Sequence, residues 1–211
     1  MSIQLPSPVL AKIAYFQDRR DEVPNQELAK ELAETGDTTG IAEIASHLWD
    51  KNKNIQSDCL KVLYEIGYLT PDLIAGYACD FLNLLSSKNN RLVWGAMIAL
   101  ATVADRCADQ IWPHVAELIH VVEVGSVITT VWGIKALAKV AATSPERREK
   151  IVPFLFEQLK TCIPRDLPTH AENMLCAIDE SVKADFLSIL AGRQSELSPS
   201  QLSRLKRVQR I

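Results

Sequence analysis

The sequence predicts an all-α fold, an α-α superhelix of about six antiparallel helix pairs, and three observations support this prediction. First, the segment Ala99–Ala104, Ala-Leu-Ala-Thr-Val-Ala, returns 37 residues later as Ala136–Ala141, Ala-Leu-Ala-Lys-Val-Ala. Second, each copy follows a Val-Trp-Gly triplet by a few residues. Third, apolar residues recur with a helical period, and glycine makes up only eight of the 211 residues. A helical repeat of this length is typical of stacked helical hairpins.

Three helix starts are marked by a hydroxyl residue followed by proline, at Thr70-Pro71, Ser144-Pro145 and Ser198-Pro199. The hydroxyl can cap the first turn, and a proline at the first helical position has no N–H to leave unpaired. Gln201 completes a capping box with Ser198. Together with the 3.6-residue period, these marks predict helices at residues 8–20, 24–35, 38–50, 53–68, 71–86, 89–106, 108–123, 126–142, 145–161, 166–179, 182–194 and 198–209. Their short connections predict that consecutive helices are antiparallel.

The second helices of four successive pairs align on a column of leucines spaced 37, 37 and 38 residues apart: Leu63, Leu100, Leu137 and Leu175. The residues four positions earlier are small: Cys59, Ala96, Gly133 and Ala171. The residues three positions later are branched and apolar: Ile66, Val103, Val140 and Ile178. Because these positions share one face of a helix, we expect that face to form the core and the four leucines to be buried.

A first helix that carries proline (Pro113, Pro153), followed by a second helix of the Ala-x-x-Ala-Leu type, resembles the HEAT repeats of armadillo-like solenoids. The resemblance implies a single solenoid domain over residues 1–211. Residues 1–50 are weakly repeat-like, residues 53–179 hold the clearest repeats, and residues 182–211 form a C-terminal cap. HEAT repeats often place an arginine seven residues before the core leucine, whereas this chain has Gln56, Val93, Thr130 and Pro168 there. Stacking is therefore expected to depend on apolar packing.

The composition predicts a cytoplasmic protein with no membrane segment, and it disfavours nucleic acid as the main partner. Lys and Arg number 23 against 26 Asp and Glu, which gives a net charge of −3, and proteins that bind phosphate backbones usually carry a basic surplus. No apolar stretch reaches the roughly 18 residues of a membrane span, and the N-terminus lacks the features of a secretion signal. The five cysteines are scattered through apolar helical patterns, so we expect reduced core residues.

No motif in the sequence predicts catalysis, a metal or a cofactor. His114, Glu117 and His120 are three residues apart, which places the two histidines about 120° apart around a helix, too far for easy shared coordination. Zincin-type sites need histidines four residues apart on a helix. The chain is therefore expected not to be an enzyme, and these three residues are expected to lie on a solvated face.

Aromatic residues and the basic C-terminal helix each leave two interpretations open. Trp94 and Trp112 can anchor a partner or fill gaps between helix pairs. The cations of the last helix, Arg204, Lys206, Arg207 and Arg210, can contact nucleic acid or an acidic partner. Alternatively, that helix is an amphipathic cap with Leu202, Leu205 and Val208 facing inward.

We expect a non-catalytic scaffold or adaptor that binds a protein partner on one face of its stacked helices. Residues two before and two after each core leucine should point outward: Lys61, Ile98, Lys135 and Asn173, and Glu65, Thr102, Lys139 and Ala177. The predicted partner-binding residues are Lys61, Glu65, Trp94, Ile98, Trp112, Lys135 and Lys139. The alternative is a HEAT-like DNA glycosylase of the alkylation-repair type. Resemblance to that class would imply a basic channel and a catalytic carboxylate. A third possibility is an accessory subunit that handles a prosthetic group, but no residue of the sequence supports it.

Overall fold

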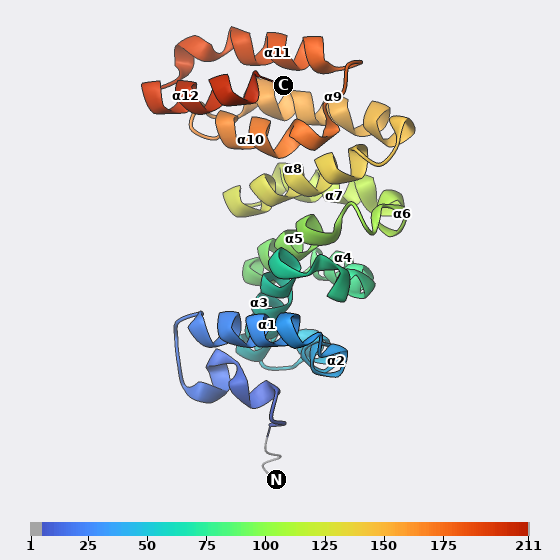
Figure 1. The fold of residues 1–211 in the computed structure, drawn as a ribbon, viewed down its shortest axis with the longest axis vertical. Helices are drawn as coiled ribbons and strands as arrows, with labels where there is room; N and C mark the ends of the chain where they lie inside the picture. The colour runs from blue at the N-terminus through green and yellow to red at the C-terminus, as the bar shows by residue number, and fades with distance from the viewer. Residues whose placement is uncertain (1–5, 211) are drawn as a thin grey trace. The chain divides into compact units, whose positions relative to one another are not determined.

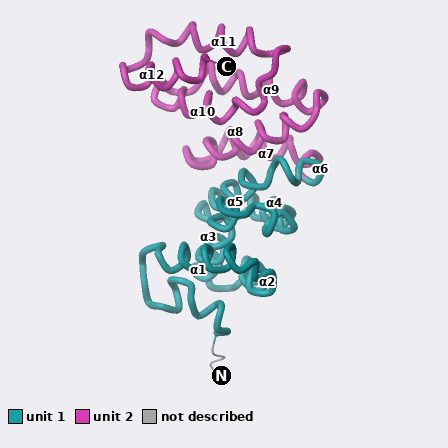
Figure 2. The backbone as a smooth tube through the Cα atoms, viewed as in Figure 1, with its two compact units in different colours: residues 1–110 teal, residues 111–211 magenta. Residues whose placement is uncertain are grey.

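The computed structural model describes residues 6–210, which form α-helices and short 3-10 helices with no strand among them (Figure 1). The all-α prediction is therefore confirmed. The chain forms two compact units, residues 1–110 and residues 111–211 (Figure 2). No helix of the described chain combines the length and the apolar character that crossing a membrane requires.

The first unit begins with two 3-10 helices, so the α-helix predicted at residues 8–20 is wrong. Its elements are η1 (Leu10–Lys12), η2 (Ala14–Gln17), α1 (Val23–Thr35), α2 (Thr38–Ser46), η3 (His47–Trp49), α3 (Lys53–Leu69), η4 (Pro71–Leu73), η5 (Ala75–Tyr77), α4 (Ala78–Leu84) and α5 (Asn90–Val103). Helix α3 packs against α1 and α5, and α5 also packs against α4. The short helix α6 (Ala108–Ile111) spans the boundary between the units.

The second unit follows the predicted helices closely, but the single helix predicted at residues 108–123 is interrupted by the 3-10 helix η6. Its elements are η6 (Trp112–His114), α7 (Val115–Val124), α8 (Val127–Ala141), α9 (Pro145–Thr161), α10 (Leu167–Met174), η7 (Leu175–Ala177), α11 (Lys183–Gly192), η8 (Gln194–Glu196) and α12 (Pro199–Val208). Helix α8 packs against α7, α9 and α10, while α11 packs on α9 and α12 packs on α10.

Two of the three predicted caps form. The Ser144 hydroxyl accepts a hydrogen bond from the Arg147 N–H at the start of α9. Ser198 and Gln201 form the full capping box of α12. The prediction for Thr70 is wrong, because its hydroxyl makes no capping bond and Pro71 begins the 3-10 helix η4. The helix predicted at residues 71–86 is therefore wrong in its first half, and only α4 is α-helical there.

The buried residues of the four repeats are spaced 37 residues apart throughout. The sequence alignment instead predicted 38 residues for the last of the three spacings. Leu63, Leu100 and Leu137 are fully buried as predicted, but Leu175 is half-buried and Met174 is the fully buried residue. The fourth repeat is therefore shifted by one position, with Ala177 buried in place of Ile178. The corrected column is Leu63, Leu100, Leu137 and Met174. The same shift moves His170, which is 3% exposed, into the column of small residues.

The cysteines and the last helix are placed only partly as expected. All five thiols are free, and Cys59 and Cys107 are buried, but Cys79 and Cys176 are exposed, so the core interpretation is wrong for those two. Burial raises the pKa of Cys59 well above the ordinary value. In α12, Leu205 and Val208 are buried and Leu202 is half-buried, as a packed cap requires. Its Arg204 pairs with Glu172 of α10.

Candidate functional site

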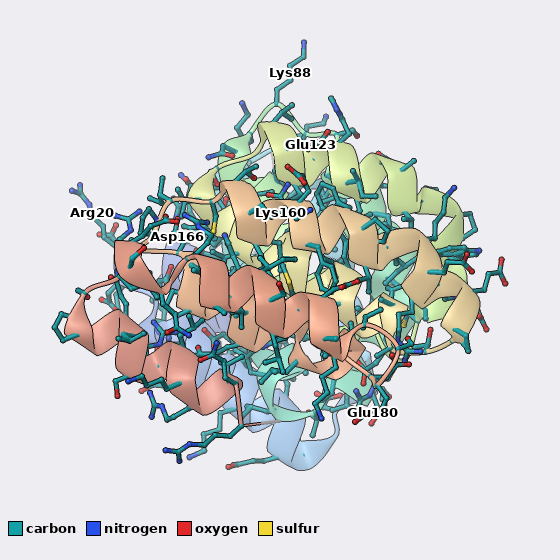
Figure 3. The ribbon with its side chains drawn as sticks, turned by 90° about the horizontal axis from the view of Figure 1, so that it is seen from above. Arg20, Lys88, Glu123, Lys160, Asp166 and Glu180 are labelled. Atoms are coloured by element: carbon teal, nitrogen blue, oxygen red, sulfur yellow. The ribbon has the colours of Figure 1, made fainter. Side chains whose placement is uncertain are left out.

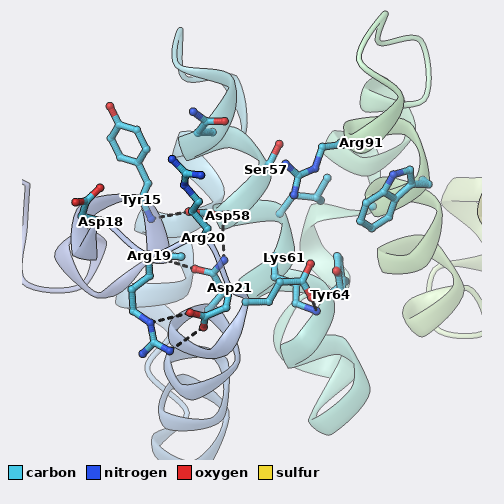
Figure 4. A pocket seen from close by; sticks show the side chains of 17 residues that line it. Tyr15, Asp18, Arg19, Arg20, Asp21, Ser57, Asp58, Lys61, Tyr64 and Arg91 are labelled. Atoms are coloured by element: carbon cyan, nitrogen blue, oxygen red, sulfur yellow. Dashed lines mark hydrogen bonds and ion pairs between the residues drawn. The ribbon is translucent and has the colours of Figure 1, made fainter.

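A polar pocket of about 360 Å³ lies within the first unit, between the segment that leads into α1, one face of α3 and the start of α5 (Figure 4). Its lining combines aromatic rings with side chains of both charges. The residues that line it are Ala14, Tyr15, Asp18, Arg19, Arg20, Asp21, Glu22, Asn25, Asn54, Ser57, Asp58, Leu60, Lys61, Tyr64, Arg91, Trp94 and Gly95.

Asn25 and Asp58 hold the N-terminal segment against α3. Asn25 is 1% exposed, and its Oδ1 accepts a hydrogen bond from the Ala14 N–H at 2.9 Å. Its Nδ2 donates to Asp58 Oδ1 at 3.0 Å, and the Tyr15 N–H donates to Asp58 Oδ2 at 2.8 Å. Just beyond, Asp18 has a φ of 51°, in the left-handed region, and there the chain turns away from η2. These bonds hold the segment before α1, which forms one wall of the pocket, against α3, which forms its floor.

Lys61 forms the centre of an ion-pair cluster on the floor of the pocket. Its Nζ lies 2.8 Å from Glu22 Oε2 and 2.5 Å from Glu65 Oε1, and 4.8 Å from the centre of the Tyr64 ring. Burial opposes the charge on Lys61, but the bonds to Glu22 and Glu65 more than offset it, so the pKa of Lys61 lies above its ordinary value. Lys61 is therefore a charged structural residue that joins the start of α1 to α3.

Two aromatic rings meet where α5 approaches α3. The ring centres of Tyr64 and Trp94 are 6.4 Å apart, and Trp94 is partly exposed at the rim. The next residue, Gly95, allows this close approach, because a Cβ there would lie 2.8 Å from Leu60 Cδ2. Trp94 therefore contributes a partly exposed aromatic side chain to the lining of the pocket.

Most charges in the pocket already have partners within it. Arg19 pairs with Asp21 at 2.9 Å, and Lys61 pairs with Glu22. In contrast, Arg20 and Arg91 are exposed and form no ion pair with any other residue that the structure describes (Figure 4). The lining therefore includes two arginines without an ion pair in the described chain, and the Arg20 side chain extends outward from the ribbon (Figure 3).

The structure brings together three of the predicted partner-binding residues, because Lys61 and Trp94 line this pocket and Glu65 pairs with Lys61. The expectation that Ile98 points outward is wrong, since it is 5% exposed. Lys61 (8% exposed), Thr102 and Ala177 are also buried, against the same expectation. They are buried because helices such as α5 are packed on more than one side: every residue from 95 to 104 is buried.

The other predicted residues belong to the second unit and lie outside this pocket. Lys135 Nζ lies 4.9 Å from the ring centre of Trp132, and burial followed by the charge of Lys139 lowers the pKa of Lys135. Trp112 is partly exposed and lies 5.7 Å from the Arg147 guanidinium. These contacts resemble cation–π packing on a helix surface.

The pocket also contains residues that the sequence interpretation did not select: Tyr15, Arg20, Asp58 and Arg91. One signal in the sequence could have found Arg91, because it lies three residues before Trp94 and so shares its helix face. Nothing in the sequence indicated that the segment before α1 would form two 3-10 helices, the second of which packs on α3.

The structure places His114, Glu117 and His120 (the His114 group) on the surface. His114 Nδ1 lies 3.4 Å from Glu117 Oε2, and both side chains are about half exposed. Within residues 6–210, no three His, Cys, Asp or Glu side chains are grouped as metal ligands would be.

Comparison with known proteins supports the fold. No family model and no curated protein matches the sequence. A designed armadillo repeat protein in complex with the peptide (KR)4 superposes with a TM-score of 0.66 at 15% identity, over 88% of this chain and 85% of that one. Computationally designed armadillo repeat proteins for modular peptide recognition give a TM-score of 0.63 at 14% identity, covering 96% and 97%. An engineered protein gives 0.62 at 20% identity, covering 95% and 94%. The fold is therefore an armadillo-type helical repeat.

Proposed function

We propose that this chain is a non-catalytic interaction module that binds a segment of a protein partner in the pocket of its first unit. One observation carries the proposal: a pocket of about 360 Å³ has the half-exposed Trp94 at its rim and a network of fixed charges at its floor. Aromatic side chains and arginine are the residues that dominate binding energy in protein interfaces. Pockets of a few hundred Å³ are large enough for one or two side chains of a bound peptide.

The similar structures support a polypeptide ligand. One designed armadillo repeat protein was solved with a peptide bound, and others were designed for peptide recognition. We extend that mode of binding to this chain as part of the proposal, because the fold is shared and the pocket lies on α3 and α5, second helices of their repeats.

The contacts of the pocket favour binding over catalysis. Asp58 of the pocket accepts hydrogen bonds from the Tyr15 N–H and from Asn25 Nδ2, which hold the N-terminal segment against α3. Lys61 is held charged between Glu22 and Glu65, so it is poorly suited to act as a nucleophile. Free thiols at all five cysteines support the proposal of a reducing compartment, the cytoplasm.

Selection from a displayed random peptide library tests the proposal. We expect the intact chain to enrich a family of peptides whose binding requires Trp94, so Trp94→Ala should weaken it by about 2 kcal/mol, roughly 30-fold. Trp49→Ala is the matched control, since Trp49 lies in the same unit, is 51% exposed and does not line this pocket. Melting curves establish that both variants fold. Peptides that bind both variants equally would contradict the proposal.

The DNA glycosylase alternative has its own measurement. We expect no sub-micromolar binding of labelled duplex or single-stranded DNA at about 150 mM salt, because phosphate binding needs a row of aligned cations. Tight binding that weakens when Lys135 and Lys139 are changed to Glu would favour the DNA-binding function instead.

A further inference from the structure

We infer that the pocket of the first unit selects an acidic peptide, in which a carboxylate side chain lies next to an apolar one. The inference rests on the proposed function and adds the chemistry of the ligand. The carboxylate would be held by Arg20 and Arg91, and the apolar side chain would lie against Trp94.

The distribution of charge in the pocket carries the inference. Among the acidic residues, Asp21 pairs with Arg19, Glu22 pairs with Lys61, and Asp58 accepts from two N–H groups. Those carboxylates are already satisfied, and only Asp18 lacks a side-chain partner among the described residues. On the basic side, Arg20 and Arg91 are both without an ion pair in the described chain. The groups left for a ligand are therefore mainly hydrogen-bond donors with positive charge.

The three residues of the proposed site come from two elements of the first unit. Arg20 belongs to the segment before α1, and Arg91 belongs to the first turn of α5, so the two enter the pocket from separate elements beside α3 (Figure 4). Trp94 lies one helical turn after Arg91 on the same face of α5. A guanidinium group binds a carboxylate through two parallel N–H bonds, which makes arginine clusters suited to acidic motifs.

The same residues argue against the other ligand classes. A basic peptide, such as the (KR)4 bound by the designed armadillo repeat protein, would meet Arg20 and Arg91 with like charge. A nucleic-acid backbone needs a row of aligned cations along several phosphates, whereas this pocket offers two arginines without an ion pair. A short acidic peptide needs only the two arginines and the aromatic rim.

The experiment compares three synthetic peptides of equal length, in which phenylalanine alternates with pairs of Glu, Gln or Lys. Binding to the full chain is measured by isothermal titration calorimetry at low and at physiological salt. We expect the Glu peptide to bind at least tenfold more tightly than the Gln peptide, the Lys peptide to bind least, and the affinity for the Glu peptide to fall as salt rises.

Charge-reversal variants assign the effect to the pocket. Arg20→Glu and Arg91→Glu should each abolish the preference for Glu, and the double variant should prefer the Lys peptide. Both arginines are exposed, so these changes leave the core intact, and Arg91→Gln serves as a milder second variant. Lys150→Glu, an exposed residue of α9, is the matched control for net charge and should change nothing.

The outcomes separate the two proposals. Binding that requires Trp94 but shows no preference for Glu, or survives both charge reversals, overturns the acidic-peptide inference and leaves the proposed function in place. If no peptide, from the library or from this set, binds in a way that requires Trp94, both are overturned. Duplex DNA that binds more tightly than the Glu peptide, and loses affinity on Arg91→Glu, also overturns the inference.

Discussion

Replacing Leu100 by alanine should cost much of the stability of the first unit. Leu100 is 0% exposed in α5, which packs against α3 on one side and α4 on another. Because every residue from 95 to 104 is buried, the surroundings can relax little into the space that the side chain leaves. Large-to-small changes at such sites cost about 2–5 kcal/mol, and we expect a value in the upper part of that range.

Equilibrium unfolding in urea, followed by circular dichroism, measures this loss. With a denaturant slope of about 1–3 kcal/mol per molar, a loss of about 3 kcal/mol lowers the midpoint by roughly 1–3 M. Hydrogen exchange over α5 assigns the loss to the first unit. A cost below about 1 kcal/mol would show that the side chain is not packed as described.

The same assay tests the register of the fourth repeat. Met174 is fully buried and Leu175 is half-buried, so Met174→Ala should cost about 2–5 kcal/mol and Leu175→Ala about 1 kcal/mol. If Leu175→Ala proves the more costly change, the spacing of 38 residues was the correct alignment and the constant spacing is refuted.

Three further predictions concern metal, glycine and acid. Chelators should leave the melting temperature unchanged; stoichiometric zinc or iron, lost together with stability on chelation, would instead implicate the His114 group. Gly67→Ala should destabilise by about 1–3 kcal/mol in urea melts, since the new Cβ would lie 2.8 Å from the Thr102 Cβ; an unchanged midpoint would contradict this. Burial lowers the pKa of His170 below 6.5, so the unfolded chain binds that proton more readily and stability should fall as the pH drops below about 6.5. His170→Ala should flatten that part of the stability profile, and an equally steep profile in the variant would refute the assignment.

The helices could be predicted from the sequence because periodicity and capping are local signals. The predicted boundaries of α3, α8, α9 and α12 agree with the structure within two residues. The N-terminal segment could not be predicted in the same way. Its second 3-10 helix, η2, is held by hydrogen bonds to Asn25 and Asp58, which lie 11 and 43 residues further along the chain than their partners.

The candidate site was predicted only in part, because the sequence argument assigned one buried face to each second helix. Residues two positions from a core leucine do lie on the far side of the helix, but in α5 that side is covered too. Ile98 and Thr102 are therefore buried, whereas Trp94, near the start of the helix, reaches the rim of the pocket. Arg20 was missed because its role depends on how the segment before α1 folds over α3.

The constant spacing of 37 residues has a consequence for changes in chain length. From Leu63 through Leu100 and Leu137 to Met174, each step returns a side chain to the same buried position. Duplication or deletion of one whole 37-residue stretch keeps every later residue on its original side of the helix. A single-residue insertion inside α8 instead rotates all that follow in that helix by about 100° and moves apolar side chains into water. We therefore expect the chain to tolerate insertions and deletions that comprise one whole repeat or that fall in the connecting loops.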